Sequence, residues 1–186
     1  EAISKTQPYI WESGANGELE KVRAYDLDYR RKVEGDIAAA ASTFIHENAH
    51  KESPFFLYVG WSHVHYPSGA AVEFKGKSAA GAYGDMLMEH DARVGEVVSA
   101  IDAAGIKDNT IIVYLSDNGP VQFEGLNDDY LGSSPGPFRG EVGDVLEGSL
   151  RVPGMIRWPS RIPARKSNEM VSIHDFLPTF ATLLGS

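Results

Sequence analysis

The sequence of 186 residues contains no cysteine, which excludes disulfide bonds, thiolate metal sites and cysteine nucleophiles. It also lacks Asn-x-Ser/Thr glycosylation sites, basic runs, hydrophobic stretches long enough to span a membrane, and a signal peptide at its start. Its 26 acidic residues outnumber its 17 lysines and arginines, so the formal net charge is −9. Neither nucleic acid nor a membrane surface is therefore expected as a partner.

The size and composition are ordinary for a folded protein with a hydrophobic core. The apolar fraction is 42% over 186 residues, so disorder is not expected. We expect one domain or part of a larger one. The chain begins with Glu1 rather than methionine, which suggests a processed or cut piece of a longer protein.

Segments with helical and strand-like patterns alternate along the chain. Apolar residues recur at helical spacing in 29–48, 83–104 and 176–184. Continuous apolar runs typical of strands occupy 55–61 and 110–115, and 150–158 is interpreted as a third strand that is broken by Pro153. This alternation predicts an α/β fold with a mostly parallel sheet flanked by helices. The first two strands are expected to be buried on both faces, and the charged residues of the first helix to lie mostly on its outer face.

Two segments are expected to lack regular structure. Residues 1–28 have no periodicity and are interpreted as a surface loop with at most a short edge element. Residues 120–147 form a long stretch rich in Gly, Asp, Ser and Pro. Loops of this length inside compact domains are usually functional or mobile.

Polar residues follow the apolar run 110–115 without a gap, in the order Ser116, Asp117, Asn118, Gly119. In open α/β sheets the ligand lies just beyond the carboxyl ends of the strands. Carboxylate and amide oxygens at such a place suit a hard cation such as calcium or magnesium. A tight turn is the alternative, because Asp, Asn and Gly are also common turn residues.

Two histidines follow the apolar run 55–61. Strand alternation would place His63 and His65 on the same face. A His-x-His pair can bind zinc, but a third ligand is not evident nearby. The alternative is that each is a hydrogen-bonded loop residue. In the next loop, Lys75 and Lys77 are expected to be solvated unless one turns inward to bind an anion.

Four segments in order resemble the sulfatases, the arylsulfatase branch of the alkaline-phosphatase-like superfamily. The resemblance runs from about residue 29 to the end of the chain. The matching stretches are PFFLYVGW followed by His65-Tyr66-Pro67, the helix and strand that end in Ser116-Asp117-Asn118-Gly119, Phe138-Arg139-Gly140 followed by Glu147-Gly148-Ser149-Leu150-Arg151-Val152-Pro153, and Arg157-Trp158-Pro159 with the closing helix. Val64 stands where the family usually has the first proline of Pro-His-x-Pro.

The resemblance implies an alkaline-phosphatase-like sandwich and a calcium- or magnesium-dependent hydrolase of sulfuric esters. Carried over by position, Asp117 and Asn118 become metal ligands and His65 a catalytic residue that contacts the sulfate or protonates the leaving group. Val142 stands where many sulfatases have a sulfate-binding lysine. Lys77 is our preferred replacement, with Lys75 and Arg139 as weaker candidates.

Two family features are missing from this sequence: the strand that ends in paired aspartates, and the Cys/Ser-x-Pro-x-Arg motif whose first residue becomes formylglycine. The nearest imitation, Ser133-Ser134-Pro135-Gly136-Pro137, has proline in place of the arginine and lies on the wrong side of the metal strand. Residues 1–186 are therefore interpreted as the carboxyl-side portion of a sulfatase catalytic domain, inactive alone and with an incomplete sheet.

The resemblance leaves several functions open. It implies a small-molecule or carbohydrate sulfate ester as substrate, and it suggests a periplasmic or secreted protein. A phosphatase or phosphodiesterase of the same superfamily would share the metal strand. A non-catalytic binding module that has lost its nucleophile is the third alternative.

Overall fold

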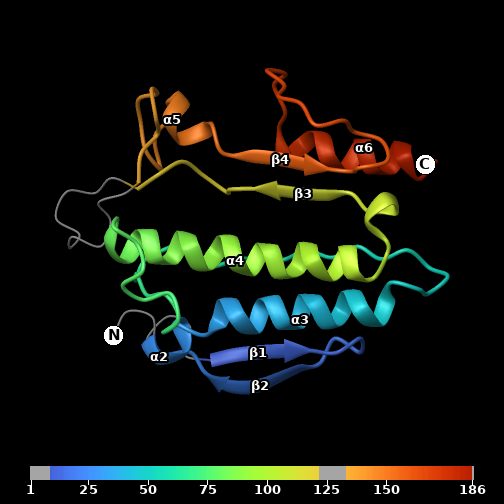
Figure 1. Ribbon diagram of the computed structural model, residues 1–186, viewed down its shortest axis with the longest axis horizontal. Helices are drawn as coiled ribbons and strands as arrows, with labels where there is room; N and C mark the ends of the chain where they lie inside the picture. Colours follow the sequence, from blue (N-terminus) through green and yellow to red (C-terminus); the bar gives the residue numbers. More distant parts are fainter. Residues whose placement is uncertain (1–8, 122–132, 186) are drawn as a thin grey trace.

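The computed structural model describes residues 9–121 and 133–185, and its centre is a pair of long helices (Figure 1). Helix α3 (Val33–Asn48) packs along helix α4 (Gly81–Ala103). Their buried faces supply most of the core, with the side chains of Ala38, Ile45 and Met86 almost completely covered. In the described part of the chain no helix is long and apolar enough to cross a bilayer.

The predicted first helix consists of two helices. The short helix α2 (Leu27–Arg30) is capped by Asp26, whose carboxylate accepts a hydrogen bond from the backbone N–H of Tyr29. Helix α3 follows after a break of two residues. The expectation that its charged residues face solvent is wrong for Arg30 and Glu34, which are 3% and 0% exposed.

The strand predicted at 55–61 has no hydrogen-bonded neighbour among the described residues. The segment is extended, because burial alternates residue by residue along it. Its inner side chains rest on the helices, as in the edge-to-face contact of Phe55 with Phe44 of α3. On the other face Phe56 and Tyr58 are 78% and 82% exposed. The prediction of a strand buried on both faces is therefore wrong for this segment.

The strands β3 (Ile112–Leu115) and β4 (Gly154–Arg157) pair antiparallel. Both lie within the predicted strands, although Leu150 belongs to the short helix α5 (Glu147–Leu150) instead. The guanidinium of Arg157 holds β4 against the end of α4 by bonding both carboxylate oxygens of Asp102, at 2.9 and 3.0 Å. The chain closes with the short 3-10 helix η3 (Ile173–Asp175) and helix α6 (Phe176–Leu183).

Residues 9–24 form a two-stranded hairpin, which is more regular structure than the expected surface loop with a short edge element. Strands β1 (Tyr9–Ser13) and β2 (Leu19–Ala24) pair antiparallel around a turn that contains Gly17. Both strand pairs in the described residues are thus antiparallel, and the mostly parallel sheet is not seen there.

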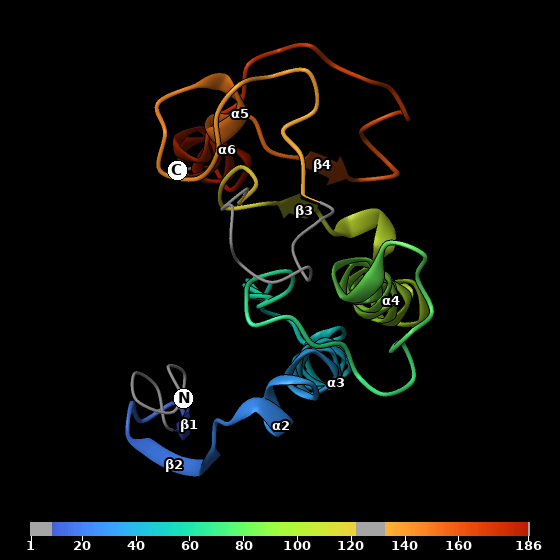
Figure 2. The same ribbon diagram turned by 90° about the vertical axis from the view of Figure 1, so that its left-hand side faces the viewer.

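The chain directions nevertheless follow the α/β pattern. In Figure 1 the extended segment 54–61 and strand β3 both run from right to left, whereas α3 and α4 both run from left to right. The 3-10 helix η1 (Lys107–Asn109) makes the turn from α4 into β3. The ends of the extended segment and of β3 therefore reach the same end of the molecule, and Figure 2 views the molecule from that end.

Candidate active site

Asp117 and Asn118 lie directly after β3, and their side chains are not used in a hairpin turn. The partner strand β4 begins only at Gly154. The exposed Asp117 carboxylate accepts one hydrogen bond through Oδ1, from the backbone N–H of Asn118 at 3.0 Å. The Asn118 amide donates to the carbonyl oxygen of Gly119 at 2.8 Å, so its own oxygen points away from that bond. The arrangement leaves one carboxylate and one amide oxygen for a ligand.

The loop that carries these oxygens is held by close backbone packing against α5. The N–H of Gly119 donates to the carbonyl of Ser149 at 2.8 Å, and the N–H of Gly148 donates to the carbonyl of Arg139 at 2.8 Å. A Cβ atom on Gly119 would clash with the carbonyl of Gly148. One on Gly148 would lie 2.7 Å from the carbonyl of Arg139. Gly119 and Gly148 belong to the two motifs that resemble the family. Both positions need glycine because the backbones of three loops approach one another closely there.

His65 lies at the end of the extended segment, in the turn Ser62–His65. The backbone N–H of His65 donates to the carbonyl of Ser62 at 3.0 Å, and the peptide bonds His63–Val64 and Tyr66–Pro67 are cis. The turn gives the two histidines opposite environments, since the side chain of His63 is 0% exposed whereas His65 is exposed. The expectation that they share a face is wrong, because strand alternation has ended before residue 62.

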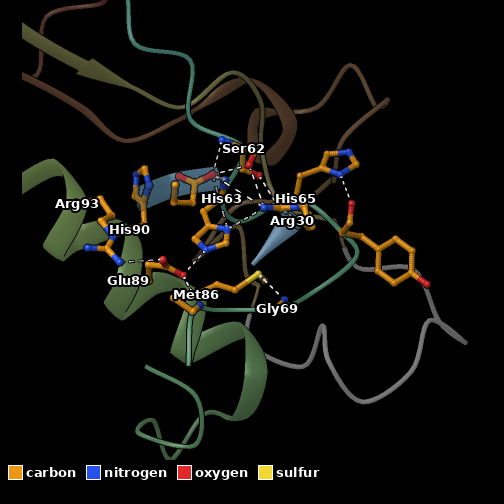
Figure 3. A network of polar contacts seen from close by, with 12 residues as sticks. Arg30, Ser62, His63, His65, Gly69, Met86, Glu89, His90 and Arg93 are labelled. Atoms are coloured by element: carbon orange, nitrogen blue, oxygen red, sulfur yellow. Dashed lines mark hydrogen bonds and ion pairs between the residues drawn. The ribbon is translucent and has the colours of Figure 1, made fainter. Parts of the chain in front are cut away.

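The exposed imidazole of His65 is held in one tautomer. Its Nδ1 lies 2.6 Å from the carbonyl oxygen of Tyr66, which can only accept, so Nδ1 carries the proton (Figure 3). The other nitrogen, Nε2, is then a base in the neutral ring and an acid in the cation. This arrangement suits a group that transfers a proton to or from a bound ligand.

Beneath the turn lies a buried network of side chains from the helices. The guanidinium of Arg30 donates to the carbonyl oxygens of Ser62 at 3.1 Å and His65 at 2.9 Å (Figure 3). The Glu34 carboxylate accepts from the backbone N–H groups of Ser62 at 2.9 Å and His63 at 3.1 Å, and from the Ser62 hydroxyl. Two side chains on adjacent turns of α2 and α3 therefore fix the loop from below.

His63 connects this network to α4. Arg30 can only donate, so His63 Nδ1 accepts its hydrogen bond at 3.4 Å and Nε2 donates to Glu89 at 2.9 Å. Burial alone would raise the pKa of Glu89. The hydrogen bonds from His63 and from the backbone N–H of Ala71, together with nearby positive charge on Arg93, hold that pKa below its usual value. Glu89 is therefore a buried carboxylate stabilised in its ionised form.

The sequence reasoning missed Arg30, Glu34 and Glu89, although a signal was present. The buried positions of α3 include Ala38, Ala41 and Ile45, and this spacing extended backward passes through Glu34 and Arg30. Charged residues on the apolar stripe of a helix need polar partners, so their place in the pattern indicates a buried network. On α4 the same holds for Glu89, next to the buried His90.

Lys77 lies in a loop fixed by the buried Asp85 of α4. The Asp85 carboxylate accepts hydrogen bonds from the backbone N–H groups of Gly76 at 2.6 Å, Lys77 at 3.0 Å and Ser78 at 2.8 Å. Burial would raise the pKa of Asp85, but these three bonds lower it below its usual value. The exposed lysine thus projects from an ordered loop.

A complete metal site is not present among the described residues. The described residues contain no group of three or more His, Asp or Glu side chains able to hold a metal ion. Lys75 and Arg139 are exposed. The loop predicted at 120–147 includes 122–132, which lies outside the described residues, while Arg139 belongs to the part packed against Gly148. Asp117 and Asn118 together offer two oxygens, fewer than the roughly six that calcium or magnesium takes.

Comparison with known proteins gives one consistent result. The family profile named Sulfatase matches residues 5–186. The chain is 39% identical to rat steryl-sulfatase over 152 residues, 81% of this chain and 26% of that protein. It is 37% identical to an N-acetylgalactosamine-6-O-sulfatase of Bacteroides thetaiotaomicron, over 73% of this chain and 28% of that protein. Human arylsulfatase A is 34% identical over 83% of this chain and 30% of its own length.

Solved structures agree with the sequence relatives. A Bacteroides thetaiotaomicron structure designated BT33336S-sulf, from work on glycosaminoglycan metabolism, superposes with a TM-score of 0.78 at 32% identity over 90% of this chain and 35% of its own. The PsFucS1 sulfatase from Pseudoalteromonas sp. gives 0.77 at 27% identity, over 88% of this chain and 32% of its own. The chain spans between a quarter and a third of the length of its curated relatives. It belongs to the sulfatase family and has part of the family's alkaline-phosphatase-like fold.

Proposed function

We propose that the protein carrying this chain hydrolyses sulfate esters and that this chain supplies part of the metal site and an acid–base histidine. The observation that carries the proposal is that the segment before the His65 turn (54–61) and the strand before the Asp117–Asn118 pair (β3) run to the same end of the molecule (Figure 1). The turn and the pair follow different segments, as expected for a site at the carboxyl ends of strands. Family membership supports the same reaction.

The donor atoms fit a calcium ion, or magnesium in a tighter site. Asp117 offers a carboxylate and Asn118 a neutral oxygen, and hard divalent cations prefer such ligands over the nitrogen and sulfur ligands of zinc. A bound cation would neutralise charge on the sulfate oxygens and activate the nucleophile. The remaining ligands would come from outside the described residues.

His65 would act on the leaving oxygen. With Nδ1–H donated to the carbonyl of Tyr66, the protonated ring presents Nε2–H outward. A proton given to the leaving oxygen prevents a high-energy alkoxide or phenoxide from forming. Lys77 would bind a sulfate oxygen in place of the lysine replaced by Val142, and Arg139 is the weaker candidate for the same contact.

The catalytic domain would be completed by further parts of the polypeptide, which also supply the formylglycine nucleophile. The unpaired segment 54–61, with Phe56 and Tyr58 exposed, supports this proposal, because an apolar strand face is normally covered. So does the length of the relatives, of which this chain covers about a quarter to a third. On this basis residues 1–186 are a carboxyl-side portion, inactive alone.

Substrates of two classes follow from the named relatives. Rat steryl-sulfatase is named for a steroid ester and the Bacteroides enzyme for a sulfated amino sugar. We propose a small-molecule or carbohydrate sulfate ester for this protein. The loops that would distinguish the two classes include residues outside the described part of the chain.

The test compares sulfate with phosphate esters on the intact protein, purified with its formylglycine-generating partner enzyme. We expect calcium-dependent release of nitrophenol from 4-nitrophenyl sulfate, loss of that activity in Asp117→Ala and His65→Gln, and little turnover of 4-nitrophenyl phosphate. Turnover of phosphate alone would establish a phosphatase instead. No turnover of either ester, in a protein whose nucleophile position lacks Cys or Ser, would establish the non-catalytic module.

A further inference from the structure

We infer that Arg30 is a positioning residue for His65, an inference that rests on the proposed function. The guanidinium is 3% exposed and contacts both ends of the turn Ser62–His65. One nitrogen donates to the carbonyls of Ser62 and His65, at 3.1 and 2.9 Å, and the other donates to the Ser62 hydroxyl at 2.9 Å. No other residue type offers several donors in a rigid planar fork of this kind.

The contact with the His65 carbonyl sets the position of the exposed ring. The imidazole is tied to the next carbonyl along the chain, that of Tyr66, through Nδ1 at 2.6 Å. The backbone that follows His65 is thereby held at two successive carbonyls, that of His65 by Arg30 and that of Tyr66 by the imidazole, and Arg30 also holds the Ser62 carbonyl at the start of the turn. The outward direction of Nε2 then depends on the guanidinium beneath the turn (Figure 3).

Buried charges compensate one another around Arg30, which keeps the guanidinium in place. Glu34 lies 3.9 Å from it on the next helical turn and is 0% exposed. His63 accepts a hydrogen bond from Arg30 and donates one to Glu89. The Glu89 carboxylate in turn forms an ion pair with Arg93 at 3.5 Å. Within this network each of the two carboxylates has a guanidinium beside it, Arg30 beside Glu34 and Arg93 beside Glu89, and the imidazole of His63 connects the two pairs.

The neighbouring Arg31 is a matched control. It is the same residue type on the adjacent position, but its side chain is exposed and pairs with Asp28 at 3.2 Å near the start of α2. It makes none of the contacts to the turn that Arg30 makes. Arg30→Lys keeps the positive charge next to Glu34 while losing the fork, and Arg31→Lys makes the same chemical change at the control position.

A double-mutant cycle on the intact, formylglycine-loaded protein tests the inference, with kcat measured on 4-nitrophenyl sulfate and on an alkyl sulfate. We expect Arg30→Lys to lower kcat about 10- to 100-fold, as misplacement of a catalytic group does. We expect a larger loss for the alkyl ester, whose leaving oxygen needs the proton more. In a His65→Gln background the same change should have almost no further effect, and Arg31→Lys should leave kcat unchanged.

The outcomes of this experiment separate the positioning role of Arg30 from the proposed sulfatase activity. Equal losses with and without His65 would overturn the positioning role, since Arg30 would then act only on folding or on another group. Arg30→Met provides a second variant, and thermal melting of every variant reports the folded fraction separately. If the formylglycine-loaded protein without substitutions hydrolyses no sulfate ester, the proposed function fails instead, whatever the variants do.

Discussion

Nε2 of His90 lies 2.9 Å from the phenol oxygen of Tyr114, and this hydrogen bond joins helix α4 to strand β3. The same imidazole packs edge-to-face on Trp61 at the end of the extended segment, with ring centroids 5.6 Å apart. One buried ring thus contacts both segments that lead into the candidate site. Burial lowers the pKa of His90 despite the raising effect of Glu34, and burial raises that of Tyr114.

Stability is therefore expected to fall on acidification through His90. Its folded-state pKa lies below the ordinary 6.5, so the unfolded chain binds the proton first and stability decreases as pH falls below about 6.5. The slope from one proton is at most about 1.4 kcal/mol per pH unit. Urea unfolding of the intact protein between pH 8 and 5 should show this slope, and His90→Gln should remove it.

The exposed His46 of α3 is the control for this measurement. His46→Gln should leave the slope unchanged. The carboxylates Asp85 and Glu89, whose pKa values are lowered, stabilise the fold above their ordinary pKa and lose that contribution only at lower pH. A slope near pH 6 that persists in His90→Gln would contradict the assignment.

Asp85→Asn is expected to loosen the loop that carries Lys77. The carboxylate accepts three backbone N–H groups, and an amide has only one oxygen to replace two. Hydrogen exchange at the amides of Gly76, Lys77 and Ser78 should become about tenfold faster, which corresponds to a loss of about 1.4 kcal/mol in local stability. If Lys77 binds the sulfate, KM should rise more than kcat falls. Unchanged exchange at the three amides would count against the anchoring role.

Gly119→Ala should disrupt the loop that carries Asp117 and Asn118, whereas Gly95→Ala should not disturb the structure. A methyl group on Gly119 would lie 2.8 Å from the Cα of Ser149 and closer to the Gly148 carbonyl, so the two loops must separate. Gly95 lies on the exposed face of α4 with open space around it, and alanine there should stabilise by about 0.5–1 kcal/mol. Thermal melting with and without calcium measures both effects; a stable, calcium-responsive Gly119→Ala protein would refute the packing argument.

Calcium should stabilise the intact protein through Asp117. A ligand at about 100 times its Kd adds about 2.7 kcal/mol to the free energy of unfolding. Chelation should abolish this gain together with activity, and Asp117→Asn should melt at the same temperature with and without calcium. Asp91→Asn, on the exposed face of α4, should retain the full calcium response. A calcium response that survives in Asp117→Asn would place the ion elsewhere.

Phe56 provides a test of the proposal that further parts of the polypeptide complete the sheet. In this chain its side chain is 78% exposed, so truncation would remove few contacts. In the intact protein we expect the same residue to be covered, and Phe56→Ala should then cost about 3–5 kcal/mol in urea unfolding. Val72, which is 85% exposed in a loop, gives the comparison through Val72→Ala. A cost near zero for Phe56→Ala would mean that the face stays open to solvent.

The sequence by itself determined the long helix α4, the strand β3 and the polar residues that follow that strand. These features depend on local chemistry, because helical periodicity, β-branched runs and residues such as Asp and Asn leave a signal within a few positions. Only the tertiary structure decided that Arg30 and Glu34 are buried and that the His63 side chain is buried whereas His65 is exposed. Only the tertiary structure, too, showed that segment 54–61 pairs with no strand among the described residues. Burial of a charge and pairing of a strand depend on partners far away in the chain, and no local pattern contains them.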